Sequence, residues 1–459
     1  MNKIADGKPT QWQRHGLLLL LTLFYGETFI GRQIIAVMIE PIKLEFGTSD
    51  TQMGLMSGLA FAVVFAVLGL PAGQLADKKS RTRILAFCAL AWAFATALCG
   101  FAVGFYMLVA ARMLVAVAEV PIGSSSMSLI ADLYPLNKRA FAISCYTSAA
   151  TIASILALGL GAYLIGQLGW RHTFFLLSIP ALILSAVFFI FVKEPKRGQF
   201  NHKSQANLTA VQTELTSSNG TLADTLRSLW AHKRFKLLVF SSAMATMSAN
   251  AFGMWNITFI MRSHQLELYN AGLLAGVIGG GSAAIGILLG GYLADKRSVR
   301  TSPLQLPIIG HILGVTSLYL YLLWPSEQTI LIFGHNVPVA MFACALTSFF
   351  SVWWVGPCFS LLTNLVPAHQ RAVAIACQSI LVSFLGMGVG PVLVGSLSDI
   401  LSPRMGEESL RYALIFSSFS TIIAIFLLIK LNQIFTANDP NYIDVSSSTQ
   451  SKLNQIHSE

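Results

Sequence analysis

Two charged side chains lie in the middle of the first long apolar segment. In residues 24–34, FYGETFIGRQI, Glu27 and Arg32 interrupt a run from Gly16 to Ile39 that is long enough to cross a bilayer. Charges at that depth are costly and usually mark the path of a substrate or a proton. The planar arginine fork suits a phosphate or a carboxylate, whereas a buried carboxyl group can hold a proton. These residue types therefore predict anion binding at Arg32 and proton exchange at Glu27.

A second charged pair, Arg112 and Glu119, lies in the fourth long apolar segment. The two residues are seven positions apart, so they lie within about 20° of one another on a helix. Glu27 and Arg32 are five apart, about 140° around their helix, and cannot simply neutralise each other. At least one residue of the first pair should therefore face a partner on another helix.

The composition places these charges in a membrane protein. The chain has 459 residues, of which 54% are hydrophobic and 11% charged, with a mean hydropathy of +0.66. Ordinary soluble domains have about 25% charged residues. The sequence predicts an all-α polytopic membrane protein with twelve transmembrane helices, whose approximate cores are 16–39, 52–76, 83–103, 106–131, 140–168, 172–192, 235–261, 270–294, 304–324, 337–366, 372–398 and 411–432.

The distribution of Lys and Arg predicts the orientation. Of the 30 such residues, 23 lie on the side that carries both tails, five lie on the opposite side, and two are within the membrane. By the positive-inside rule, both termini are expected in the cytoplasm and the protein in the plasma (inner) membrane. Topology thus explains the net charge of +10 without a nucleic-acid partner.

The two halves of the chain resemble each other. GQLADKK at 73–79 recurs as GYLADKR at 291–297, and LIADLYPLNKRAFAIS at 129–144 recurs as LLTNLVPAHQRAVAIA at 361–376. The repeat unit is six helices, an arrangement typical of rocker-type transporters. We expect two pseudo-symmetric six-helix bundles at 1–199 and 229–434, joined by a cytoplasmic linker at 200–228 and followed by a polar cytoplasmic tail at 435–459. Leu222 to Phe235 could form an amphipathic helix.

These motifs resemble those of the major facilitator superfamily. The signature between its second and third helices is matched at Gly73, Asp77, Lys78 and Arg81, while Ser80 and Thr82 depart from it. Other stretches resemble bacterial spinster-like proteins, namely EPIKLEFGTSDTQMGLMSG, RMLVAVAEVPIGSSSMSLIADLYPLNKRAFAIS, GWRHTFFLLSIPALI and VKEPKRG. The resemblance implies a proton-coupled secondary transporter that works by alternating access on a lysophospholipid or sphingoid-type lipid. It implies no enzymatic activity, no cofactor beyond the proton gradient, and a monomer whose partners are its substrate and membrane lipids.

The resemblance also assigns roles to the charged residues. If the first and fourth helices line one cavity, Arg32 can contact Glu119, which leaves Glu27 free to titrate. The family has an aspartate where this chain has Gly31. Glu27 is one turn before Gly31 on the same face, so we expect it to replace that aspartate in proton coupling. Glu119 is expected to serve both proton coupling and substrate binding.

The remaining candidates divide into a cavity set and a gating set. Polar and aromatic residues of three helices are expected to help Arg32 bind the substrate, namely Tyr25, Asn256 and Trp354. The cytoplasmic motifs are expected to form a latch that favours an outward-open state. With Arg112, the gating residues are Gly73, Asp77, Lys78, Arg81, Arg139, Asp295 and Arg371.

Other functions stay open on the sequence. Within transport, the alternatives are an organic-anion or sugar-acid proton symporter and a drug/proton antiporter, although residues 140–168 lack the proline that such antiporters usually carry. A membrane receptor or enzyme is the alternative of a different class. The chain has no HExxH, GxSxG or CxxC motif, its six cysteines lie in apolar segments, and no metal site is expected.

Overall fold

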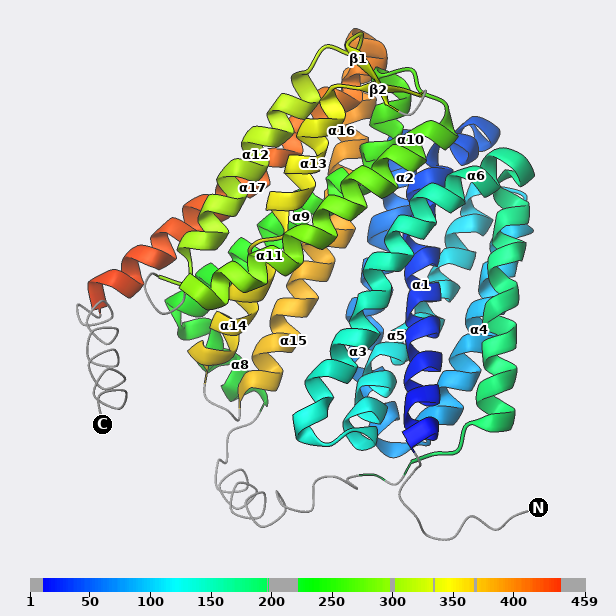
Figure 1. Ribbon diagram of the computed structural model, residues 1–459, viewed down its shortest axis with the longest axis vertical. Helices are drawn as coiled ribbons and strands as arrows, with labels where there is room; N and C mark the ends of the chain where they lie inside the picture. The colour runs from blue at the N-terminus through cyan, green and yellow to red at the C-terminus, as the bar shows by residue number, and fades with distance from the viewer. Residues whose placement is uncertain are drawn as a thin grey trace. The chain divides into compact units, whose positions relative to one another are not determined.

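The computed structural model describes residues 11–195, 197, 222–297, 302–332, 335–366 and 370–438 (Figure 1). Within these ranges the protein is almost entirely helical, which confirms the predicted fold class. The residues form two compact units, the first comprising Met1–Asn219 and Glu267–Gly276 and the second Gly220–Leu266 and Val277–Glu459.

The first unit is built from long helices. It contains α1 (Gln11–Phe46), α2 (Asp50–Gly54), the π-helical η1 (Leu55–Leu59), α3 (Ala60–Lys78), α4 (Arg81–Gly100), α5 (Phe105–Leu133), α6 (Leu136–Phe191) and α10 (Leu268–Leu274). In this unit α1 and α4 both pack against α6, and α5 packs against α3 and α4 (Figure 1).

The second unit repeats the helical plan and adds a small sheet. Its elements are α8 (Leu222–Ala231), α9 (Lys233–Ser263), most of η2 (Ala275–Gly280), α11 (Gly281–Arg297), α12 (Gln305–Leu323), β1 (Thr329–Ile332), β2 (His335–Pro338), α13 (Ala340–Ser351), α14 (Val355–Leu365), α15 (Arg371–Leu381), η4 (Val382–Val389), α16 (Gly390–Met405), η5 (Gly406–Glu408) and α17 (Ser409–Asn438). The short α8 begins at Leu222 as expected of the amphipathic helix, but it ends at Ala231, and Phe235 belongs to α9.

The described residues include ten helical segments long and apolar enough to cross a membrane. Two of them, Phe141–Phe191 and Val373–Phe435, hold 51 and 63 residues, whereas one crossing needs about 20. Each is interrupted by a glycine with positive φ, 77° at Gly169 and 55° at Gly406. Such backbone favours glycine and breaks a helix, so the two segments each accommodate two crossings. The observed spans are therefore consistent with the twelve predicted.

One predicted boundary is wrong. The segment 337–366 was expected to be a single helix, but its first residues belong to β2, which pairs antiparallel with β1 so that Ile330 lies opposite Val337. Aliphatic and β-branched residues favour this hairpin, and the helix begins only after Pro338. The same segment is interrupted again between α13 and α14.

Capping fixes where α4 begins. Ser80 has extended backbone and its hydroxyl accepts a hydrogen bond from the Arg83 amide at 3.4 Å. Serine is a favoured residue at this position because its oxygen satisfies an otherwise unpaired helical amide. The residue that replaces the signature's turn glycine is therefore the cap of α4, and it directs Arg81 into the first turn.

Candidate functional site

The contact predicted between the first and fourth spanning helices is present. Arg32 of α1 donates from Nε to Oε1 of Glu119 on α5 at 2.6 Å. The Glu119 side chain is 3% exposed and that of Arg32 is 25% exposed. The terminal nitrogens of Arg32 make no hydrogen bond with any residue in the described ranges. One edge of the guanidinium is thus held, and the rest is available to an anion.

Aromatic rings surround the same guanidinium. Its central carbon lies 5.4 Å from the ring centroid of Phe29, 5.1 Å from that of Phe61 and 4.9 Å from that of Phe65. Phe61 and Phe65 are one turn apart on α3, and their rings stack at 4.9 Å. Cation–π contacts of this kind favour the arginine position without using its donors. Neither α3 ring was predicted from the sequence, although their i, i+4 spacing is visible there.

Arg112 lies deeper in the unit than Arg32. It is 4% exposed, and its Nη1 donates to the carbonyl oxygen of Gly31 at 3.1 Å. A Cβ added at Gly31 would come within 2.6 Å of the Trp92 ring, so the space that an aspartate would need is already filled. Arg112 therefore braces the α1 backbone beside Arg32, and its predicted gating role stays a prediction.

Glu27 is also buried, at 7% exposure. Neither of its carboxyl oxygens has a well-formed hydrogen bond to a described residue, although the backbone of Ala181 on α6 approaches them closely enough to interact. No described basic side chain forms an ion pair with it, which agrees with the expectation that Arg32 pairs elsewhere. Its role in proton coupling remains a prediction.

Tyr25 lies near this group and stacks on Tyr146 of α6, with ring centroids 4.5 Å apart and an interplanar angle of 23°. Tyr25 is partly exposed and Tyr146 is 1% exposed. The stack fixes the Tyr25 ring one turn before Phe29, whose ring it also contacts at 5.4 Å. Tyr146 carries no signal in the sequence, because its partner is far along the chain.

The candidates of the second unit lie in its interior packing. Asn256 is 6% exposed, and its Oδ1 accepts a hydrogen bond from the Tyr321 hydroxyl at 2.7 Å. Trp354 is 8% exposed, with its ring 6.2 Å from that of His311. Helix packing accounts for both positions as they stand, so their predicted contact with substrate stays a prediction.

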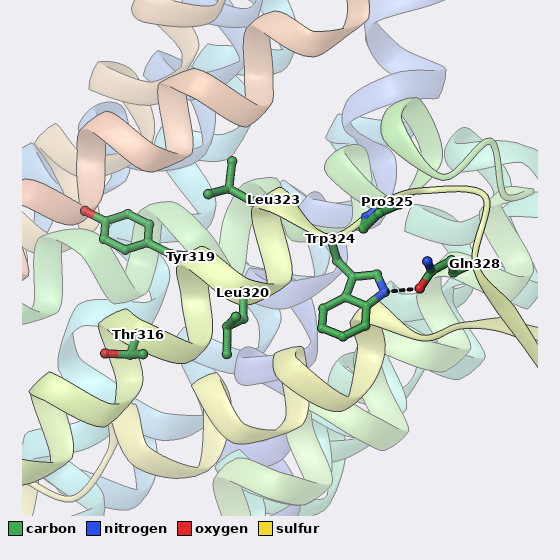
Figure 2. A pocket seen from close by; sticks show the side chains of 7 residues that line it. All are labelled: Thr316, Tyr319, Leu320, Leu323, Trp324, Pro325 and Gln328. Atoms are coloured by element: carbon green, nitrogen blue, oxygen red, sulfur yellow. Dashed lines mark hydrogen bonds between the residues drawn. The ribbon is translucent and has the colours of Figure 1, made fainter.

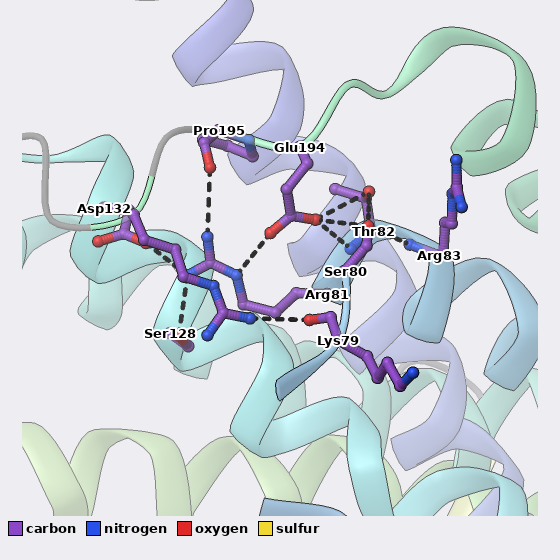
Figure 3. A network of polar contacts seen from close by, with 10 residues as sticks. Lys79, Ser80, Arg81, Thr82, Arg83, Ser128, Asp132, Glu194 and Pro195 are labelled. Carbon is purple, nitrogen blue, oxygen red and sulfur yellow. Dashed lines mark hydrogen bonds and ion pairs between the residues drawn. The ribbon is translucent and has the colours of Figure 1, made fainter. Parts of the chain in front are cut away.

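Arg81 is the centre of a polar network in the first unit (Figure 3). Its side chain is 1% exposed and donates to Asp132 of α5 at 2.5 Å and to Glu194 after α6 at 2.8 Å. It also donates to the Ser128 hydroxyl at 2.9 Å. One arginine thus ties the start of α4 to the ends of α5 and α6. Arg81 was predicted from the sequence, but neither of its carboxylate partners was.

Glu194 has a second function in this network. It accepts hydrogen bonds from the Thr82 amide and the Ser80 hydroxyl, each at 2.9 Å, and so caps α4 (Figure 3). Burial raises the pKa of Glu194, but the hydrogen bonds from Thr82, Arg81 and Ser80 outweigh burial and hold the pKa below its ordinary value. Glu194 thus holds the start of α4 against the segment that follows α6.

The other predicted gating residues are placed less fully. Arg139 donates from Nη2 to the Ala131 carbonyl at 2.7 Å and ties the start of α6 to α5. Gly73 lies in α3. The side chains of four residues lie outside the described part of the structure, namely Asp77, Lys78, Asp295 and Arg371.

A groove of about 400 Å³ lies along the last turns of α12 (Figure 2). Its lining is Thr316, Tyr319, Leu320, Leu323, Trp324, Pro325 and Gln328. The Trp324 indole nitrogen donates to the Gln328 side chain at 3.0 Å. The lining carries no formal charge, and Leu320 and Leu323 are exposed on the outside of a spanning helix. This surface suits lipid chains better than an anion-binding transport site.

Comparison with known proteins identifies the class. The family model described as "Major Facilitator Superfamily" matches residues 21–376, and the chain belongs to this superfamily of transporters. It is therefore a multi-pass membrane protein.

Within the superfamily the chain is similar to spinster proteins and to an efflux pump. It is 26% identical to "Protein spinster homolog 1" of Xenopus tropicalis over 89% of this chain and 79% of that protein. It is also 26% identical to an "MFS-type efflux pump" of Mycolicibacterium smegmatis over 89% of each chain. The crystal structure of a bacterial homolog of the human lysosomal transporter spinster matches the fold with a TM-score of 0.81 at 23% identity, covering 94% of this chain and 99% of that one.

Proposed function

We propose that the protein is a proton-coupled secondary transporter of an amphipathic anion, of the lysophospholipid or sphingoid-phosphate type. The observation that supports this proposal best is the position of Arg32. Its partly exposed guanidinium is held at one edge by Glu119 and lies within an aromatic cage. A cation suits a phosphate, and the rings suit an alkyl chain beside it. Similarity to a "Sphingosine-1-phosphate transporter" of Danio rerio, 23% identical over 93% of this chain and 84% of that protein, supports the same substrate class.

The geometry suggests how binding couples to protons. A substrate anion that binds the terminal nitrogens of Arg32 shares the positive charge with Glu119 and can draw the guanidinium away from that carboxylate. A buried carboxylate that loses its cationic partner is destabilised by several kcal/mol. Proton uptake by Glu119 removes that penalty, and deprotonation restores the pair and expels the anion. Glu27 of α1, the helix that carries Arg32, is buried and forms no ion pair with a residue that the structure describes, so it is a second group that can exchange a proton.

We place the protein in the plasma (inner) membrane with both termini in the cytoplasm. On this orientation the Arg81 network lies on the cytoplasmic side, where it can stabilise one state of the alternating-access cycle.

The test is transport in proteoliposomes, with and without a pH gradient, of a lysophospholipid, a sphingoid phosphate and a phosphate monoester with no alkyl chain. We expect gradient-dependent movement of the amphipathic compounds and at least a tenfold loss in Arg32→Lys, which keeps the charge but not the fork. Arg83→Gln, at an exposed residue, is the matched control and should retain transport. Equal activity of Arg32→Lys and wild type would refute the anion-binding role.

Export of a small organic compound is the second candidate, favoured by the similarity to the mycobacterial efflux pump. The same vesicles distinguish the two functions. If the vesicles transport a non-lipid cation or a neutral drug, and Arg32→Lys transports it at the wild-type rate, export of that compound replaces the lipid proposal.

A further inference from the structure

Four basic residues gather where α8 meets α9. We call Arg227, Lys233, Arg234 and Lys236 the basic elbow. Arg227 and Lys233 are exposed, and Arg234 and Lys236 are partly exposed. None of the four makes an ion pair with a residue that the structure describes. The elbow is therefore a concentrated positive surface, with Asp224 as the one acidic residue within α8.

The apolar side of α8 is fixed to the second unit. Leu229 is fully buried and belongs to the core cluster that includes Phe235 of α9. The Ser228 hydroxyl donates to the Gln370 side chain at the start of α15, at 3.4 Å. Figure 1 shows α8 at the end of this unit, close to α15. The basic residues are consequently held at a defined place and not on a free segment.

An aromatic surface adjoins the elbow. The ring of Trp230 contacts those of Phe235 and Phe240 at 6.0 Å and 5.9 Å. Phe240 is 38% exposed on α9, which is a membrane-spanning helix. Arg227 and Trp230 are three residues apart and share a face of α8. Tryptophan and arginine at the end of a spanning helix are typical of the boundary between acyl chains and headgroups.

Helix stability does not account for these charges. Basic residues are unfavourable in the first turn of a helix, where the backbone dipole is already positive. The first turn of α9 carries Lys233, Arg234 and Lys236 and contains no acidic residue. The positive-inside rule accounts for basic residues at this end of a spanning helix, but it does not specify that four of them gather beside the rings of Trp230 and Phe240.

We propose that the basic elbow binds the headgroup of an anionic phospholipid of the surrounding membrane, with Trp230 and Phe240 against its glycerol and upper acyl carbons. The lipid is a bound partner on the outside of the second unit and not the transported substrate, so the proposal is independent of the transport function. The charge complementarity selects anionic headgroups over zwitterionic ones. The aromatic surface selects a lipid over free phosphate.

Native mass spectrometry of the purified full-length protein tests this, by titration with phosphatidylglycerol and, separately, phosphatidylcholine. Each basic residue near an anionic lipid surface contributes about fivefold in affinity. We expect wild type to prefer phosphatidylglycerol, and the triple variant Arg227→Gln/Lys233→Gln/Lys236→Gln to bind it at least tenfold more weakly. The matched control Lys79→Gln/Arg83→Gln/Lys138→Gln removes three exposed charges elsewhere and should change binding less than twofold.

Two further arms keep the outcome decisive if the triple variant folds poorly. Wild-type binding of phosphatidylglycerol should weaken at raised ionic strength, and Trp230→Leu should weaken it with all charges intact. Inorganic phosphate should not displace the lipid. The proposal would be overturned if the elbow and control variants lost lipid affinity equally, or if neither lost any. Displacement of phosphatidylglycerol by inorganic phosphate would also overturn it.

Discussion

Removing both carboxylates from Arg81 should destabilise the first unit by more than the two single substitutions together. Arg81 is 1% exposed, and Asp132 and Glu194 are its two anionic partners in the described structure. Either carboxylate alone still compensates the buried charge. Replacing both by amides keeps the side-chain volume and most hydrogen-bond acceptors but leaves the arginine charge uncompensated.

The magnitudes follow from burial. Asp132→Asn replaces a charged acceptor at 2.5 Å by a neutral one, which should cost about 1–2 kcal/mol. Glu194 is 29% exposed, and its amide variant can still accept from Thr82, so Glu194→Gln should cost about 1 kcal/mol. A buried charge that loses its partners costs about 3–5 kcal/mol. The double variant should therefore exceed the sum of the singles by about 1 kcal/mol or more.

Thermal unfolding in detergent, followed by a thiol-reactive dye, measures this difference. Cys88 and Cys99 of α4 are buried, so they react when the helix that carries Arg81 unfolds. A loss of 3–5 kcal/mol should lower the midpoint by roughly 10 °C in a unit of this size. Glu408→Gln is the matched control, because its carboxylate is 42% exposed and pairs with Arg411 at the surface. The shared-charge account of Arg81 would be refuted if the losses of unfolding free energy in the two single variants added up to that of the double variant. It would also be refuted if the double variant were no less stable than Glu408→Gln.

Three further predictions concern single positions. The folded-state pKa of Glu194 lies below its ordinary value of 4.5. Its contribution to the free energy of unfolding is therefore fully present above about pH 4.5 and is lost as the pH falls through the folded pKa. The difference in unfolding midpoint between wild type and Glu194→Gln should be constant above about pH 4.5 and shrink below it. Gly31→Ala places a Cβ 2.6 Å from the Trp92 ring and should cost about 1–3 kcal/mol; the same dye assay should show partial recovery in Gly31→Ala/Trp92→Leu, and no loss in Gly31→Ala would contradict the packing. Glu27→Gln should fold normally but reduce proton movement per substrate transported, measured with a pH-sensitive dye inside proteoliposomes, and unchanged coupling would exclude Glu27 as a proton carrier.

Much of the fold follows from local properties of the sequence. Apolar blocks of about 20 residues define the spans because the bilayer sets their length. The reversal at Gly169 could be placed between two blocks, since glycine takes a positive φ without strain. The β1–β2 hairpin was missed because each strand has only four residues, and the last two residues of β2 run directly into the apolar sequence of α13.

The candidate site was predictable only in part. Arg32 and Glu119 are conspicuous because charge is rare in these segments, and their pairing follows once the helices are arranged. Trp92, which fills the space beside Gly31, is one apolar residue among many in α4. Its contact depends on how α1 and α4 pack, and no pattern within either segment specifies that distance.

The position of Gly31 changes how the missing aspartate is understood. Trp92 occupies the space beside Gly31, and Arg112 donates to the Gly31 carbonyl oxygen. An aspartate at position 31 would need both the Trp92 ring and Arg112 to move. The packing around α1 therefore explains why glycine, and not aspartate, fits at this position. Glu27 faces α6 one turn earlier, whereas Arg32 faces α5. Any proton held by Glu27 must therefore act on Arg32 through the position of α1 and not through direct contact.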